Sequence, residues 1–254
     1  TKIELGWEMI QRAQARGLPF EAVACDTLYG RSPWLRDQCT QAHIECYSDV
    51  PVNTQVYLSQ PQIGMPEAKQ ARHEQVLSPD PMSVDQVGSL PDTLWQRLVL
   101  RPSERGMLEV SFAARRVWTV RDDGRAVEEW LLIRQDPGRH TYTLSNAPAN
   151  TPLLILATRK SARSFAERSN EDATSEFRAE DFQATKFRAW DHHLALTILA
   201  SWFIAETKIE WSALYTRDPA LYEHYQVDIL PALSVANVRE LLRAALPLPQ
   251  LSPA

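Results

Sequence analysis

The chain has 254 residues, of which 44% are hydrophobic and 23% are charged, and its formal net charge is −5. This length can bury a sizeable core, and the composition is ordinary for a globular domain. The acidic balance argues against a small, dedicated DNA-binding module, although it is compatible with an enzyme that has a local basic channel.

The cysteine content and the hydropathy narrow the cellular context. Cys25, Cys39 and Cys46 form no CxxC pair, so we expect reduced thiols and no zinc site. No signal peptide is visible, and the longest apolar run, 194–205, is too short to span a bilayer. We therefore expect a cytoplasmic protein without membrane contact.

The first 51 residues predict alternating helices and strands. Apolar side chains at roughly helical spacing predict a helix over 3–16. The run FEAVACD (20–26) predicts a buried strand, 34–44 predicts a second helix, and 45–51 predicts a second short strand. This order is typical of a parallel α/β sheet.

The middle of the chain has a different pattern. Residues 52–105 are proline-rich and weakly periodic, which predicts a loop or a partly ordered insertion. The runs VSFAARRVWTV and EEWLLIR, on either side of a DDG turn, predict an antiparallel hairpin, and HTYTLSNA adds a further strand. We therefore divide the chain into an α/β part (1–51), a loop with a β-rich insertion (52–150) and a helical part (151–254).

The helical part contains three predicted helices. The first covers 153–177 and the second, over 182–215, is so apolar that we expect it to be mostly buried. A last short helix over 234–248 begins at Ser234 and ends at a proline.

Asp26 is the first candidate for chemistry. It ends a predicted buried strand and precedes a turn, which is where open α/β sheets bind their ligands and metals. The competing interpretation is a helix N-cap or turn aspartate, and position alone favours that interpretation.

The acidic stretch RSFAERSNEDATSEF is the second candidate. On a helix, Arg163, Glu167, Glu171 and Thr174 share one face. Such a helix is more often a solvated surface, but its small residues and the apolar helix that follows favour a position against a core. GxSxG, Walker-A and GxGxxG motifs are absent, which argues against serine hydrolases and nucleotide-binding enzymes.

Several separated segments together resemble a known family. In FEAVACDTLYGRSP…DVPVNTQVY a strand ends in Asp and is followed by xxYG and VPxNTxV. EEWLLIR…YTLSNAPANTPL and AERSNEDATSEF…HHLALTILASWFIAETKIEW follow in the same order. On these motifs the chain resembles bacterial insertion-sequence transposases of the DDE superfamily endonuclease type, closely over about 107–211 and diffusely over 52–105.

The resemblance implies a ribonuclease-H-like α/β fold in which three carboxylates hold two divalent metal ions, Mg²⁺ or Mn²⁺. Such ions support cleavage and strand transfer at DNA phosphodiester bonds. It implies that Asp26 is the second carboxylate and Glu167 the third, each a catalytic residue and a metal ligand. Arg163 would face a DNA phosphate or orient Glu167, and Lys160 and Arg159 would help to bind the DNA backbone.

The chain also departs from the family pattern. The first aspartate and the strands that carry it would lie upstream of residue 1, Thr174 stands where a lysine is expected, and Lys160 stands where a tyrosine is common. We therefore expect an incomplete ribonuclease-H-like fold that is inactive alone. The alternatives are a non-catalytic protein that binds transposon ends or full-length transposase, and a decayed remnant. An unpaired edge on the Asp26 strand would favour self-association.

Overall fold

The structure is a computed structural model that describes residues 1–64, 75–103, 106–136, 138–177, 179, 185–215 and 233–245. The chain divides into two compact units. The first comprises Thr1–Leu100 and Glu109–Arg163, and the second comprises Arg101–Leu108 and Ser164–Ala254.

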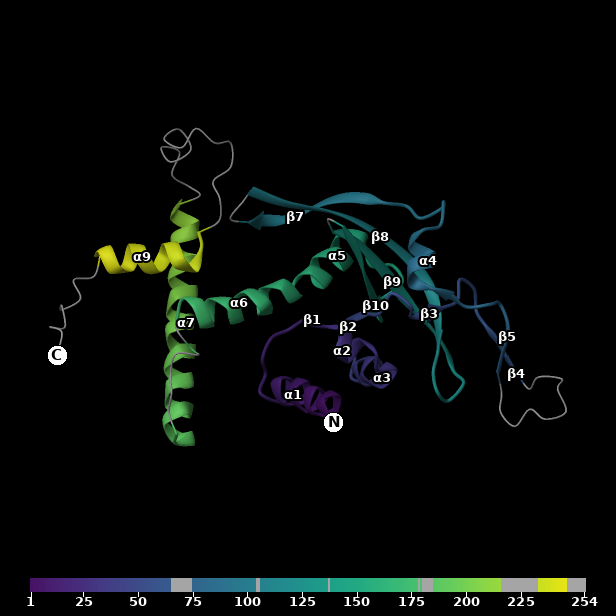
Figure 1. Ribbon diagram of the computed structural model, residues 1–254, viewed down its shortest axis with the longest axis horizontal. Coiled ribbons are helices and arrows are strands. Elements are labelled where there is room, and N and C mark those ends of the chain that lie inside the picture. The colour runs from purple at the N-terminus through teal and green to yellow at the C-terminus, as the bar shows by residue number, and fades with distance from the viewer. Residues whose placement is uncertain are drawn as a thin grey trace. The chain divides into compact units, whose positions relative to one another are not determined.

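A six-stranded mixed sheet, most of it in the first unit, has the strand order β1-β2-β10-β9-β8-β7 (Figure 1). Its strands are β1 (Ala22–Cys25), β2 (Glu45–Val50), β7 (Gln96–Ser103), β8 (Gly106–Val120), β9 (Ala126–Asp136) and β10 (Arg139–Ser145). β1 and β2 are parallel, whereas β10 is antiparallel to both β2 and β9, and β8 is antiparallel to β9. The predicted α/β class and the predicted hairpin are therefore confirmed, and the hairpin strands extend the same sheet that contains β1 and β2.

The predicted helix–strand–helix–strand order of the first 51 residues is present. α1 (Lys2–Ala15) begins with a capping box in which Thr1 and Glu4 bond to each other's backbone. α2 (Thr27–Gly30) and α3 (Pro33–Gln41) connect β1 to β2. A parallel pair of strands needs such a crossover, because its two strands enter the sheet from the same end.

Helices cover both faces of the sheet. α1 and α3 pack on one face through a cluster of Trp7, Leu35, Cys39, Ile44 and Cys46. α5 (Leu153–Ser161) packs Leu156 against Tyr47 and Leu132 in a separate cluster. Because successive strand residues point to opposite faces, Leu132 of β9 joins this cluster, while Leu131 and Ile133 join a third cluster with α4 (Val84–Gly88).

The segment predicted as a loop or a partly ordered insertion contains short elements. These are β3 (Gln55–Val56), β4 (Gln62–Gly64), β5 (Gln75–Ser78), β6 (Met82–Ser83), α4 and β7. β3 pairs with β6, and β4 pairs with β5, in two small antiparallel sheets. The part of the prediction that concerns 65–74 lies outside the described residues.

Apart from residues 101–103 and 106–108, which belong to β7 and β8, the second unit is mainly helical where it is described. Its helices are α6 (Arg163–Ser175), whose first residue belongs to the first unit, α7 (Phe187–Tyr215) and α9 (Val235–Ala245). α7 packs one stripe, which includes Ile204 and Trp211, against Leu233 and Val238.

The prediction that the long apolar helix is mostly buried is wrong. Trp202, Phe203 and Ile209 are 64%, 55% and 73% exposed. The reason is that apolar residues surround α7 on all sides, while its contact with α9 covers a single stripe. None of the helices described is long and apolar enough to cross a membrane.

Gly30 marks the closest approach between α2 and β2, and we expect its replacement to be strongly destabilising. A Cβ atom at this position would lie 1.8 Å from the main-chain oxygen of Asp49. Gly30→Ala should therefore lower the free energy of unfolding by at least about 3 kcal/mol, at the upper end of what overpacking costs. Gly64→Ala is the matched control, because its Cβ would meet the movable side chain of Leu77 at 3.2 Å. Urea denaturation of both variants measures the difference, and equal losses would contradict the close approach.

Candidate functional site

Asp26 follows β1 directly and caps α2. Its Oδ1 accepts hydrogen bonds from the main-chain N–H groups of Leu28 and Tyr29, at 2.9 and 3.4 Å. The interpretation of Asp26 as a helix N-cap is thus confirmed. The side chain is exposed, and Oδ2 forms no hydrogen bond within the described residues. One oxygen of this carboxylate is therefore available to a ligand, and the metal-ligand role stays a prediction.

Asp49 lies at the neighbouring strand end. Cys25 of β1 pairs with Ser48 of β2, so Asp26 and Asp49 are the next residues along two adjacent parallel strands. The carboxyl ends of parallel strands are the usual location of ligand sites in α/β sheets. Asp49 was not among the predicted site residues. The signal was present, because ECYSDVP, like FEAVACD, is a short predicted strand with an aspartate near its carboxyl end.

Asp49 is held by three side chains of the first unit. Its Oδ1 accepts from Thr143 Oγ1 at 2.5 Å and from Lys160 Nζ at 2.8 Å, and Arg163 Nε lies 3.6 Å from Oδ2. The side chains of Asp49 and Lys160 are only 13% and 6% exposed. Two cations already compensate the charge of this carboxylate, so it is a poor metal ligand and a strong anchor for α5.

The three cations predicted to bind DNA all contact carboxylates. Arg159 donates from Nη1 to Glu45 at 2.6 Å and from Nη2 to Glu21 at 2.7 Å. The hydrogen bond to Glu21, followed by that to Glu45, raises the pKa of Arg159 above its ordinary value. Lys160 is buried in its ion pair, which gives it a structural role, whereas Arg163 is 33% exposed. DNA contact by these residues stays a prediction.

Glu167 lies on α6, four residues after Arg163, which is the spacing of neighbours on one helix face. It is exposed and belongs to the second unit, whereas Asp26 belongs to the first. On the same helix Glu171 is 71% exposed and lies 3.9 Å from Arg168, as expected for a solvated face. Thr174 donates its hydroxyl to the carbonyls of Asn170 and Glu171, so it presents no charge.

The arrangement of donor side chains limits where a metal ion could bind. Across the described ranges, no group of three or more His, Cys, Asp or Glu side chains is arranged to hold a metal ion. Asp26 fits the role of a single oxygen ligand, since it is exposed and its Oδ2 forms no hydrogen bond within the described residues, and such ligands suit Mg²⁺ or Mn²⁺. A complete two-metal site would need Glu167 and a further carboxylate.

The first unit contains a buried ion network. Glu129 of β9 is 1% exposed and lies between Arg36 and Arg121, at 2.9 and 3.1 Å. Burial alone would raise the pKa of Glu129, but the two guanidinium groups and a hydrogen bond from Thr119 lower it to about 2. None of these residues was among the predicted site residues.

The three cysteines are free, and two of them lie close together. Cys25 Sγ and Cys46 Sγ are 3.9 Å apart on neighbouring strands. Hydrogen bonding to Cys46 and burial raise the pKa of the Cys25 thiol well above its ordinary range. A thiol that stays protonated is a weak nucleophile, so we assign no catalytic role to it.

Neither a comparison with models of known protein families nor a comparison with curated protein sequences finds a match to this chain. The candidate site is therefore defined by its own geometry: an exposed carboxylate at a strand end, a compensated carboxylate on the neighbouring strand and a buried ion network that connects α3 to β9.

We expect the Lys160 ion pair to stabilise the first unit. Lys160→Met leaves the largely covered Asp49 with one cation fewer, and we expect a loss of about 3 kcal/mol, the lower end of the cost of breaking a buried pair. The double variant Asp49→Asn/Lys160→Met should recover part of that loss, because the uncompensated charge is gone. Thermal and urea unfolding measure both effects. Lys2→Met, at an exposed position on α1, is the control, and an equal, small effect for Lys160→Met would contradict the buried pair.

Glu129 should make the stability depend on acid. Its pKa in the folded protein lies below the ordinary value of 4.5, so its stabilising effect is complete above about pH 4.5 and is lost as the pH falls towards 2. Glu129→Gln should therefore cost roughly 3 kcal/mol at pH 7 and much less at pH 2.5. The neighbouring Glu128, whose exposed pair with Arg116 is worth little, provides the control Glu128→Gln. Urea unfolding at several pH values measures the two variants, and a pH-independent difference for Glu129→Gln would contradict the assignment.

Proposed function

We propose that this chain is part of the catalytic domain of a DDE-type transposase, with a ribonuclease-H-like core, and that it acts on phosphodiester bonds of DNA. The observation that carries the proposal is the position of Asp26 at the carboxyl end of β1, in a parallel unit with β2, with one carboxylate oxygen open to a ligand. The resemblance of the surrounding sequence supports the same residue as the second carboxylate of the family.

Glu167 is the second proposed metal ligand. It has the family's spacing from Arg163, lies on the same helix and is exposed. Together with Asp26 it would hold Mg²⁺ or Mn²⁺, and these ions would activate the attacking oxygen and stabilise the leaving one. The role of the chain's own residues is to position those carboxylates, and Arg163, which lies 3.6 Å from Asp49, would orient Glu167 or face a phosphate.

The edge of the sheet supports the ribonuclease-H-like assignment. β1 is the terminal strand, and its outer edge pairs with no described strand. Strand edges of this kind pair readily with a further strand. The proposed fold needs such a strand at this edge to carry the first carboxylate of the family pattern. It would come from a further segment of the same protein or from a second transposase molecule.

The second candidate function is a non-catalytic protein of the same system. Residues 1–254 contain two of the three expected carboxylates, and Thr174 replaces a cation that would contact DNA. A protein of this kind would bind transposon ends or full-length transposase in the cytoplasm without cleaving DNA, and a decayed remnant would do neither.

Metal binding provides the direct test of the catalytic assignment. We expect the 254-residue chain to bind Mn²⁺ weakly, and Asp26→Asn and Glu167→Gln each to reduce the affinity at least about tenfold, since each removes an anionic ligand. Glu171→Gln is the matched control, because Glu171 is on the same helix and exposed. Electron paramagnetic resonance titration of free Mn²⁺ measures all four proteins. Equal affinities would contradict the assignment.

The same chain should neither nick supercoiled DNA nor transfer strands with Mg²⁺ or Mn²⁺, because a carboxylate is missing. Salt-sensitive binding to transposon-end DNA without cleavage would support the second candidate, and loss of both DNA and Mn²⁺ binding would indicate a remnant. Nicking that Glu167→Gln abolishes would show instead that residues 1–254 suffice for catalysis.

A further inference from the structure

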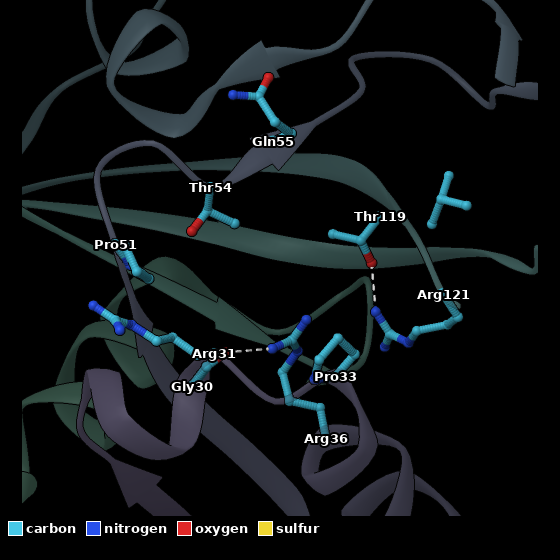
Figure 2. A pocket seen from close by; sticks show the side chains of 10 residues that line it. Gly30, Arg31, Pro33, Arg36, Pro51, Thr54, Gln55, Thr119 and Arg121 are labelled. Carbon is cyan, nitrogen blue, oxygen red and sulfur yellow. Dashed lines mark hydrogen bonds between the residues drawn. The ribbon is translucent and has the colours of Figure 1, made fainter. Parts of the chain in front are cut away.

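A small cavity in the first unit lies next to Gly30, the last residue of α2 (Figure 2). Its walls are the turn between α2 and α3, the first residues of α3, the segment 51–55 that follows β2, and the end of β8. Its volume is about 180 Å³. A single water molecule needs only about 10–15 Å³, so the cavity has room for an ion of several atoms.

The lining of this cavity is positively charged. Arg31, Arg36 and Arg121 line it, together with the polar side chains of Thr54 and Gln55, and no lining residue is a carboxylate. Arg36 and Arg121 are each only 4% exposed. Because a guanidinium group stays protonated at every physiological pH, this charge is permanent.

Both buried arginines are held in place by hydrogen bonds to neighbouring residues. Arg36 donates from Nε to Glu129 at 2.9 Å and from Nη1 to the carbonyl of Gly30 at 2.8 Å. Arg121 donates from Nε to Asp37 at 2.8 Å and from Nη1 to Thr119 at 2.7 Å. These bonds fix both side chains, so little conformational freedom is left to lose on binding.

Each of these arginines keeps one terminal group unused. Nη2 of Arg36 and Nη2 of Arg121 form no hydrogen bond with any residue that the structure describes. Neither nitrogen is among the solvent-inaccessible polar atoms that lack a hydrogen-bond partner. Figure 2 shows both guanidinium groups turned towards the same space between α3 and the end of β8. Since both arginines line the cavity, we assign these two Nη2 groups as the donors that would meet a bound anion.

The charge balance around the cavity favours an anion. Glu129 and Asp37 compensate Arg36 and Arg121, and both carboxylates lie outside the lining. Arg31 is exposed and has no ion pair among the described residues, so it adds an excess positive charge at the mouth. The positive end of α3, which begins at Pro33 in the wall, acts in the same direction.

We propose that this cavity is a binding site for a phosphate group. A tetrahedral oxyanion presents enough acceptors to take hydrogen bonds from both Nη2 groups and from Arg31 at once, and the planar fork of arginine matches phosphate oxygens. Inorganic phosphate and the backbone phosphate of DNA share this chemistry. The site is built from residues other than the proposed metal ligands and does not depend on catalysis.

The test is calorimetric titration of inorganic phosphate into the 254-residue chain, in a chloride buffer free of phosphate and sulfate. We expect saturable binding in the millimolar range or tighter. Arg31→Ala should weaken it at least about fivefold, and Gln55→Glu, which places a carboxylate at the cavity, should weaken it further. The controls Arg16→Ala and Gln62→Glu make the same changes at exposed positions away from the cavity and should leave the affinity within twofold.

Absence of saturable phosphate binding, or equal binding by Arg31→Ala, Gln55→Glu and their controls, would overturn the site. Neither Arg31 nor Gln55 is buried, so these variants should fold, and circular dichroism checks that they do. A second titration in the presence of a short DNA duplex identifies the source of the phosphate. If the duplex weakens phosphate binding, and Arg31→Ala abolishes this competition, the site binds the DNA backbone. If the duplex leaves phosphate binding unchanged, the site binds the free ion. Both outcomes are independent of Mn²⁺ binding at Asp26 and Glu167.

Discussion

One buried carboxylate connects the parts of the first unit on which the candidate site depends. Glu129, on a central strand, binds Arg36 of α3 at 2.9 Å, and Arg36 also binds the carbonyl of Gly30 at the end of α2. The two helices of the β1–β2 crossover are thereby tied to a strand distant in sequence. Asp26 caps the start of the same short helix, so its position is set partly by an ion pair that it does not contact.

This arrangement is sensitive because its charges are buried. A carboxylate taken out of water is stable only while its partners remain, and loss of either partner leaves an uncompensated charge. The oxygens of Glu129 are therefore shared, with Arg36 on Oε1 and with Thr119 and Arg121 on Oε2. Hydrogen bonds of this type define a single orientation of α3 against the sheet, which a purely apolar contact defines less well.

The periodicity of the sequence predicted most helices and strands, but it did not predict the side-chain contacts between them. The helices and strands of the first 51 residues, and the hairpin with its following strand, were found because alternating and helical patterns reflect local geometry. Glu128 and Glu129 look alike in EEWLLIR, yet Glu129 shares its face with Leu131 and Ile133. The alternation of side chains along this strand was therefore a usable signal that Glu129 is buried. The partners Arg36 and Arg121 were not predictable, because their pairing depends on how α3 crosses the sheet.

In the candidate site, too, the features set by local sequence were predictable and the features set by packing were not. Asp26 was found from its place at a strand end, and Asp49 could have been found by the same rule. The long apolar helix was expected to be buried from composition, but burial depends on the area of the surfaces that meet, and α9 covers one stripe. Composition sets how much apolar surface a helix has and does not set how much of it is covered.

The two ends of α2 present opposite chemistry. Asp26 offers a carboxylate oxygen at the start, and the arginine-lined cavity lies at the end, after four helical residues, or about 6 Å of helical rise. Metal-assisted chemistry on a phosphodiester needs both anionic ligands for a cation and cationic donors for a phosphate. Either group alone has an ordinary structural explanation, as a helix cap or as a buried ion network. Their separation by one short helix, which Gly30 holds against β2, is the observation that connects the two proposals.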